Sequence, residues 1–151
     1  MKMSDIIAEF IGEMLSDGGG VAELQRKSLA EHFDCVPSQI NYVIETRFTP
    51  ESGYLVESQR GGGGYIRIVR LMDDKQRTLL EAARGVGGHL TQNDAAKLTR
   101  ALISAELLSP REGQLLLSAC SDGALAEVDK TDRDRLRASI FRCAVMGIAT
   151  T

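Results

Sequence analysis

The chain has 151 residues, 43% of them hydrophobic, which is enough to form the core of one ordinary domain or of two small ones. Its formal net charge of −3 argues against a nucleic-acid partner held by bulk charge alone, so the placement of basic residues matters more than their sum. The opening residues MKMSDIIAEF lack the features of a secretion signal, and no stretch reaches the roughly 18 apolar residues of a membrane span, so we expect a cytoplasmic protein without a membrane partner.

The first helix is predicted over residues 4–15, SDIIAEFIGEML, where apolar side chains recur at helical spacing and Ser4 can serve as the N-cap. Residues 17–20, DGGG, favour a C-cap and a loop. At Ser28 the sequence SLAE fits a capping box, which predicts a short helix from Leu29 to Phe33. Two helices joined by a glycine loop therefore open the chain.

A longer helix is predicted to begin at Pro37, because proline disfavours helical geometry at the residue before it but is well tolerated at the first helical position. Its inward face carries the aliphatic residues Ile40, Val43 and Ile44. Its outward face carries the hydrogen-bonding residues Ser38, Gln39, Asn41, Tyr42 and Glu45. Such side chains can read base edges in a DNA major groove, where glutamine and asparagine suit adenine best; the plainer alternative is an ordinary solvated helix face.

From Gly53 the apolar residues alternate, and GYLVESQ and YIRIVRL predict the two strands of a β-hairpin. Beyond Met72 the pattern is helical and predicts four helices. It is broken in three places, at residues 85–88, 109–110 and 121–123. The predicted fold is therefore α+β, with an N-terminal winged helix-turn-helix over residues 1–72 and an all-α four-helix domain over residues 75–151.

The predicted hairpin tip consists of Arg60, Gly61, Gly62, Gly63 and Gly64. Ordering each glycine costs about 0.5 to 1 kcal/mol more than ordering alanine, so the run requires a compensating interaction. Glycine allows close approach to a polyanion, and the negative potential of a narrow minor groove favours arginine. The alternatives are a disordered loop and a phosphate cradle for a nucleotide, but the run lacks the G-x-G-x-x-G spacing and the chain has no P-loop.

Basic residues fall at turns, at element ends and in the hairpin, where phosphates can be reached: Arg26, Lys27, Arg47, Arg60, Arg67 and Arg70. Together with the order of the elements, this placement predicts a DNA-binding module. A protein-interaction module is the alternative, because winged helices sometimes bind proteins through the same face and the chain is acidic overall. The salt dependence of binding distinguishes a DNA-binding module from a protein-interaction module, since binding dominated by phosphate contacts weakens steeply as the salt concentration rises.

No nucleophile with an associated base can be named in the sequence. His32 and Cys35 lie three apart and could share a metal, but no second close pair exists, so a helix-surface histidine and a buried thiol are favoured. His89 is interpreted as a loop or capping residue, and three scattered cysteines indicate reduced thiols. We therefore expect neither an enzyme nor a cofactor.

The string CVPSQINYVIETRFTPESGYLVESQRGGGGYIRIVR, from Cys35 to Arg70, closely resembles the CtsR family, the class three stress gene repressors of low-GC Gram-positive bacteria. The SDII opening at Ser4 and the stretch LISAELLSPREGQLLLSA also resemble the family. Residues 16–22 and 84–95 diverge from it.

The resemblance implies a dimeric repressor of Clp protease and chaperone genes that heat releases from operator DNA. It implies that the helix from Pro37 to Arg47 enters the major groove, that the wing at Arg60 to Gly64 enters the minor groove, and that the C-terminal helices form the dimer. Lys27, where the family pattern has arginine, and Arg47 match positions that touch the DNA backbone, and Ser28 joins this contact set. The resemblance also implies a protein-arginine kinase and a Clp ATPase or protease as partners, with Arg60 as a regulatory phosphorylation site.

Two further expectations follow from the residues themselves. The helical half carries more apolar side chains than a small solitary bundle needs, which favours a homodimer: Leu79, Leu80, Leu98, Leu102, Leu115, Leu116, Leu136 and Ile140. Ordering a four-glycine tip costs entropy, so a DNA-docked wing should lose favour as temperature rises. The wing is therefore a candidate thermometer.

Overall fold

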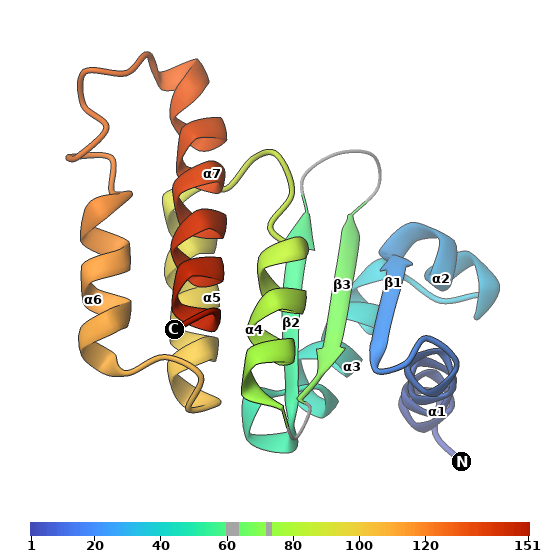
Figure 1. Cartoon of the computed structure of the whole chain (residues 1–151). Helices are drawn as coiled ribbons and strands as arrows, with labels where there is room; N and C mark the ends of the chain where they lie inside the picture. Colours follow the sequence, from blue (N-terminus) through green and yellow to red (C-terminus); the bar gives the residue numbers. More distant parts are fainter. Residues whose placement is uncertain (60–63, 72–73) are drawn as a thin grey trace. The chain divides into compact units, whose positions relative to one another are not determined.

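A computed structural model describes residues 1–59, 64–71 and 74–151 of the chain (Figure 1). The chain forms two compact units, Met1–Leu71 and Met72–Thr151. Within the described ranges, no helix has both the length and the apolar character needed to cross a membrane.

The first helix, α1 (Met3–Asp17), buries one apolar face through Ile7, Ile11 and Leu15. It begins one residue before the predicted N-cap Ser4, with Lys2 as the N-cap. Gly18 ends it as predicted, and only glycine fits there, because a Cβ would lie 2.1 Å from the carbonyl oxygen of Val21.

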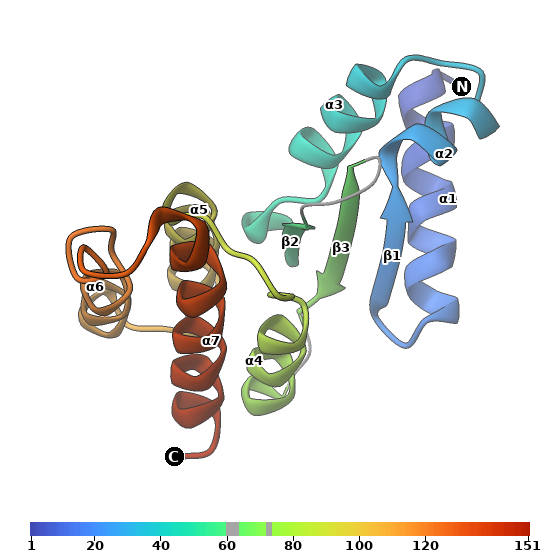
Figure 2. The same ribbon diagram turned by 90° about the horizontal axis from the view of Figure 1, so that it is seen from above.

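A strand that the sequence did not predict follows this turn, β1 (Val21–Gln25). Figure 2 shows α1 running beside it. The helix α2 (Arg26–His32) starts where β1 ends, with Gln25 as its N-cap, so the predicted capping box at Ser28 is wrong. The Ser28 hydroxyl instead donates a 2.6 Å hydrogen bond to the Gln25 side chain. The strand fixes the helix start, because the Arg26 N–H is already bound to Gly64.

The helix α3 (Pro37–Arg47) begins at the predicted proline and buries the three predicted aliphatic residues, Ile40, Val43 and Ile44. A 3₁₀ turn, η1 (Pro50–Ser52), leads into the hairpin strands β2 (Tyr54–Gln59) and β3 (Tyr65–Arg70), which are also as predicted. The sheet is antiparallel in the order β1-β3-β2, so β3 is the central strand. Side chains of β1 and β3 complete one core with α1, α2 and α3.

Arg67 lies at the centre of this sheet, opposite Glu23 of β1 and Glu57 of β2. Its guanidinium Nε is 3.4 Å from a Glu23 carboxylate oxygen, and its Nη1 is 3.8 Å from one of Glu57. Only 6% of Arg67 is exposed, so the expectation that it can reach phosphates is wrong. The two flanking carboxylates compensate the buried charge across the strands instead.

Residues 74–151, the part of the second unit that the structure describes, form four helices, as predicted: α4 (Lys75–Arg84), α5 (Gln92–Ser104), α6 (Pro110–Ala119) and α7 (Lys130–Ala149). The first three are N-capped by side chains of Asp74, Thr91 and Ser109, which accept from the backbone N–H three residues on. Ser109 and Glu112 form a complete capping box. The first residues of α4, α5 and α6 are therefore marked by capping residues close by in the sequence.

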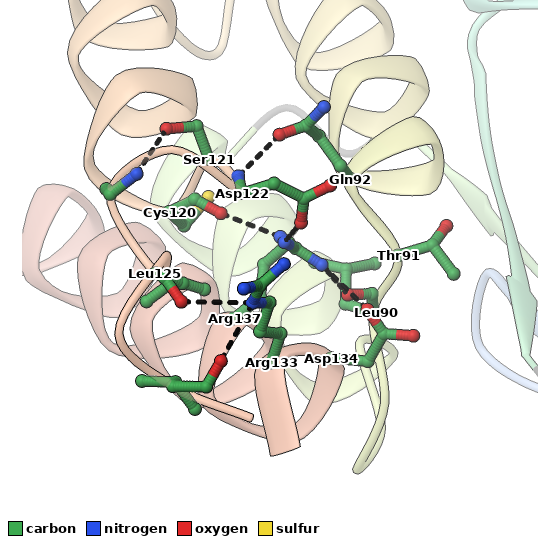
Figure 3. Close-up of polar contacts among 12 residues, drawn as sticks. Leu90, Thr91, Gln92, Cys120, Ser121, Asp122, Leu125, Arg133, Asp134 and Arg137 are labelled. Atoms are coloured by element: carbon green, nitrogen blue, oxygen red, sulfur yellow. Dashed lines mark hydrogen bonds and ion pairs between the residues drawn. The ribbon is translucent and has the colours of Figure 1, made fainter. Parts of the chain in front are cut away.

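A buried arginine ties α7 to two connecting segments (Figure 3). The Arg137 guanidinium is 1% exposed and donates to the carbonyl oxygens of Cys120, at 2.7 Å, and Leu90, at 3.1 Å. It also pairs with the carboxylates of Asp134 and Asp122. These contacts satisfy a charge that would otherwise be costly to bury.

Candidate nucleic-acid interface

The outward face of α3 is polar and accessible. Ser38 and Tyr42 are exposed, with Tyr42 at 58%, whereas Gln39 and Asn41 are half-buried. The three aliphatic residues on the opposite face anchor the helix, which packs against α1 and α2. The fold therefore presents hydroxyl and amide groups on a rigid element, an arrangement suited to reading base edges.

Arg26 connects this face of α3 to the hairpin. The sequence placed it among the basic residues able to reach phosphates but did not predict its contacts with α3 and β2. Its Nε donates to Oδ1 of Asn41, and its Nη2 donates to the Ser58 hydroxyl at 3.3 Å. Burial lowers the pKa of this guanidinium, while attraction to Glu45 of α3 acts in the opposite direction. Recognising β1 in the sequence would have pointed to Arg26, because the residue directly follows that strand.

Gly64 is the described part of the predicted hairpin tip; Arg60, Gly61, Gly62 and Gly63 lie outside the described residues. Gly64 has a φ of +75°, and its carbonyl oxygen accepts from the Arg26 N–H at 3.1 Å. A Cβ there would lie 3.1 Å from Nη1 of Arg26. Backbone conformation and contact with Arg26 both explain why glycine occupies this position.

Two other predicted contact residues sit in the first turn of α2. Lys27 and Ser28 are both exposed. Neither residue belongs to the buried core of the unit. Their predicted contacts with DNA stay predictions.

Arg47 is the last residue of α3, and its guanidinium is 2.6 Å from the Asp5 carboxylate of α1. Both side chains are accessible, at 42% and 38%. The hydrogen bond from Arg47 lowers the pKa of Asp5, and a hydrogen bond from the Lys2 backbone adds to this effect. The basic residue predicted to touch the DNA backbone therefore already has an anionic partner within the chain.

The residues considered for metal binding have other surroundings. The His32 ring packs against two aromatic neighbours: it is tilted relative to Phe10, with the centroids 5.2 Å apart, and edge-to-face with Phe33, with the centroids 4.9 Å apart. Cys35 is half-buried rather than buried, while Cys120 is the buried thiol, and burial raises its pKa. Among residues 1–59, 64–71 and 74–151, no cluster of three or more His, Cys, Asp or Glu side chains could hold a metal.

Two family models together match almost the whole chain. Residues 2–72 match the CtsR N-terminal HTH domain, and residues 74–146 match the CtsR C-terminal dimerization domain. The order of elements agrees with these matches, and the predicted fold class is confirmed: a winged helix-turn-helix followed by a helical domain of the dimerisation type.

Relatives match this chain over nearly their whole length. The chain is 37% identical to the transcriptional regulator CtsR of Bacillus subtilis (strain 168) over 149 residues, which cover 97% of this chain and 96% of that relative. It is 45% identical to the transcriptional regulator CtsR of Lactiplantibacillus plantarum over 143 residues, covering 93% and 90%. The crystal structure of CtsR in complex with a 26bp DNA duplex matches with a TM-score of 0.52 and 36% identity, covering 98% of this chain and 99% of that one.

Proposed function

The chain belongs to the CtsR family of transcriptional regulators, and on that premise we propose that it represses stress genes by binding their operators. The genes implied by the resemblance encode Clp proteases and chaperones. One observation carries the DNA-binding part: an exposed polar face on α3 lies beside Arg26 and the hairpin, in a chain similar to a protein crystallised with a DNA duplex. The protein acts by binding and carries out no catalysis.

In the proposed complex, α3 lies in the major groove with the predicted base-reading residues Ser38, Gln39, Asn41 and Tyr42. The predicted backbone contacts are Lys27, Ser28 and Arg47, since cationic and hydroxyl side chains bind phosphate oxygens without regard to sequence. Arg60 and Gly61 to Gly64 form a wing that enters the minor groove. The exposed first turn of α2 and the accessible guanidinium of Arg47 support these assignments.

We further propose that two copies associate through the second unit. A groove of about 320 Å³ runs between α6 and α7 and is lined mainly by apolar side chains: Leu115, Leu116, Ala119, Ile140, Ala144 and Ile148. Leu115 is 64% exposed in the single chain, so a second copy seated here would remove a large apolar side chain from water. A two-fold dimer also supplies two DNA-binding domains, which multiplies the affinity for an operator with two half-sites.

Release on heating is proposed to run through the wing, because the entropy lost on ordering its glycines weighs more as temperature rises. The resemblance supports a protein-arginine kinase acting on Arg60 and a Clp ATPase or protease as further partners. Gly63→Pro removes backbone freedom at the tip and should flatten the temperature dependence of DNA affinity. A variant that binds DNA with the temperature dependence of the wild type would contradict the proposal that the wing senses temperature.

The main test uses the full-length chain and a duplex that it recovers from a randomised library. Fluorescence anisotropy should give an affinity that falls steeply between about 50 and 200 mM salt, and Lys27→Ala and Arg47→Ala should each reduce the slope by roughly one. Recovery of no preferred duplex, or binding that does not depend on salt, would contradict the proposal. That result would favour the protein-interaction module.

A further inference from the structure

Val36 is an exposed apolar residue at the start of the proposed reading helix. It is the N-cap of α3 and directly precedes Pro37. The residue is 62% exposed, more than any other large hydrophobic residue in the described part of the first unit except the terminal Met1. Packing in the core of that unit therefore does not explain a valine at this position.

Helix capping does not explain it either. An N-cap side chain usually accepts a hydrogen bond from a backbone N–H in the first turn, and valine has no atom that can do so. Among the described residues, no side-chain cap hydrogen bond is formed at the start of α3. The other α-helices that the structure describes all have polar N-cap residues: Lys2, Gln25, Asp74, Thr91, Ser109 and Asp129. A residue that breaks a local rule of stability in this way is expected at a functional site.

The backbone around Val36 is held in place. The Cys35 N–H donates to the carbonyl oxygen of Ala30 at 2.9 Å, and the Gln39 N–H donates to the carbonyl oxygen of Val36 at 3.0 Å. Pro37 favours extended backbone at the residue before it, and Val36 has a φ of −85° and a ψ of 151°. A β-branched side chain is also stiff about its single χ angle. Val36 therefore presents methyl groups that lose little conformational entropy on contact with a ligand.

The position of Val36 places these methyl groups beside the proposed base-reading residues Ser38 and Gln39. In a helix-turn-helix, the N-terminal residues of the second helix contact base edges in the major groove. The edges of the bases there carry hydrogen-bonding groups and one apolar group, the C5-methyl of thymine. A valine side chain cannot bond to a phosphate or to a polar base edge, so thymine is the base that it matches.

We infer that Val36 is a specificity-determining residue that contacts the C5-methyl group of a thymine in the major groove of the operator. This role rests on the proposed DNA binding and deepens it, because it adds a thymine to the bases read by the polar side chains of α3. The contact removes apolar surface of both groups from water. Loss of the thymine methyl group should therefore weaken binding by about threefold to fivefold.

The test removes that methyl group from the DNA. The full-length chain first selects a duplex from a randomised library, and each thymidine of this duplex is then replaced in turn by deoxyuridine, which lacks the C5-methyl group. Anisotropy titrations give the affinity of the wild type, Val36→Ala and Val36→Thr for every duplex. The wild type should lose about threefold to fivefold at one thymine in a half-site.

The two variants identify the residue that reads this methyl group. Val36→Ala should bind the unmodified duplex more weakly and lose most of the sensitivity to deoxyuridine at that one position, because protein and DNA then no longer share the contact. Val36→Thr keeps one methyl group and should retain part of the sensitivity. At all other thymines, both variants should respond to deoxyuridine as the wild type does.

Unfolding temperatures distinguish base reading from a role in folding. Val36→Thr supplies a hydroxyl that can cap α3, so it should unfold at a higher temperature than the wild type although it binds DNA less tightly. Val36→Ala should unfold close to the wild type, because the residue that it replaces is exposed. A lower unfolding temperature for both variants, with the deoxyuridine sensitivity of the wild type retained, would make Val36 a structural residue and overturn the inference.

Other results overturn it too. A wild type that is insensitive to deoxyuridine at every position reads no thymine methyl group. A Val36→Ala variant that weakens all duplexes equally and keeps the wild-type sensitivity assigns the methyl contact to another residue. If the wild type selects no duplex at all, the proposed function itself fails; selection by the wild type with no effect of Val36 on the deoxyuridine response defeats this inference alone.

Discussion

Arg47 and Asp5 form an ion pair in which Nη2 lies 2.6 Å from Oδ1, joining the last residue of α3 to the first turn of α1. The pair stands at the edge of the proposed DNA-binding surface, and both side chains are accessible. A DNA phosphate that binds Arg47 must compete with the carboxylate of Asp5 for the guanidinium. Asp5 therefore competes with DNA for Arg47, a residue that we propose contacts the DNA backbone.

Asp5→Asn should raise DNA affinity, because a neutral amide competes less well than a carboxylate for Arg47. The gain should be at most about fivefold at low salt and should shrink as salt rises, as expected for an accessible pair. Anisotropy titrations of the full-length chain measure it. Asp17→Asn is the matched control, since it removes the same formal charge from the other end of α1. Equal gains from the two variants would show that net charge alone is responsible.

The same pair predicts a pH dependence of stability. Arg47 holds the pKa of Asp5 below its ordinary value of 3.8, so the folded state favours the ionised carboxylate. The contribution to the free energy of unfolding is therefore fully present above pH 3.8 and is lost as pH falls through the lower folded pKa. Urea midpoints at pH values on both sides of 3.8 should fall less steeply with acid for Asp5→Asn than for the wild type. Parallel profiles would argue that the pair does not contribute.

Replacing Arg137 should destabilise the second unit strongly. Arg137→Met leaves two backbone carbonyls and two carboxylates without their buried donor, at a cost of about 3 to 5 kcal/mol. Arg135 is the matched control: it is 62% exposed on the same helix and pairs with Asp132. Arg135→Met should cost about 0.5 kcal/mol or less. Thermal unfolding followed by circular dichroism compares the two, and similar costs would contradict the proposed importance of the buried network.

Gly113 of α6 lies against α5, where a Cβ would be 2.6 Å from Cδ1 of Ile103 and 3.0 Å from Cγ2 of Thr99. Gly113→Ala should therefore destabilise the unit by about 1 to 3 kcal/mol through overpacking. Apart from the backbone of its own helix, nothing crowds the Cβ position of Gly147 in α7, so Gly147→Ala should stabilise by about 0.5 to 1 kcal/mol through helix propensity. Denaturant unfolding should show a lower free energy of unfolding for Gly113→Ala and a higher one for Gly147→Ala. The same sign for both would mean that helix propensity, rather than packing between helices, decides the effect at Gly113.

The proposed dimer depends on the groove between α6 and α7. Leu115→Glu places a charge in that groove and should convert the dimer to a monomer in sedimentation velocity, with little change in the unfolding of the single chain. Met3→Glu adds the same charge at an exposed apolar residue of the first unit and should leave the dimer intact. A Leu115→Glu variant that remains dimeric would place the interface elsewhere.

Local signals predicted much of this fold. Pro37 marks the start of α3, and Ser109 with Glu112 marks the start of α6, because proline and capping residues act on neighbouring backbone groups. The strand β1 was missed, since it has five residues and only Ala22 and Leu24 of them are buried. Its partner β3 is distant in the sequence, since β1 begins at Val21 and the residue paired with it is Val69.

The candidate site depended more on contacts between distant residues. The polar face of α3 could be read from its own periodicity, but the link from Arg26 to Asn41 and Ser58 arises only when β1 is paired with the hairpin. Arg67 was expected to be accessible because it lies in a hairpin strand. Pairing on both sides makes its strand central and brings Glu23 and Glu57 opposite it, which no local pattern reveals.

The central position of β3 limits how the hairpin can respond to heat. The strand is paired along its length with β1 on one side and β2 on the other, and Ile66 and Ile68 anchor it in the core of the first unit. Peeling either neighbour away would expose that core to water and unfold the unit cooperatively. The release on heating that we propose must therefore act outside the paired segments, and such a release can occur at a temperature well below the melting point of the first unit.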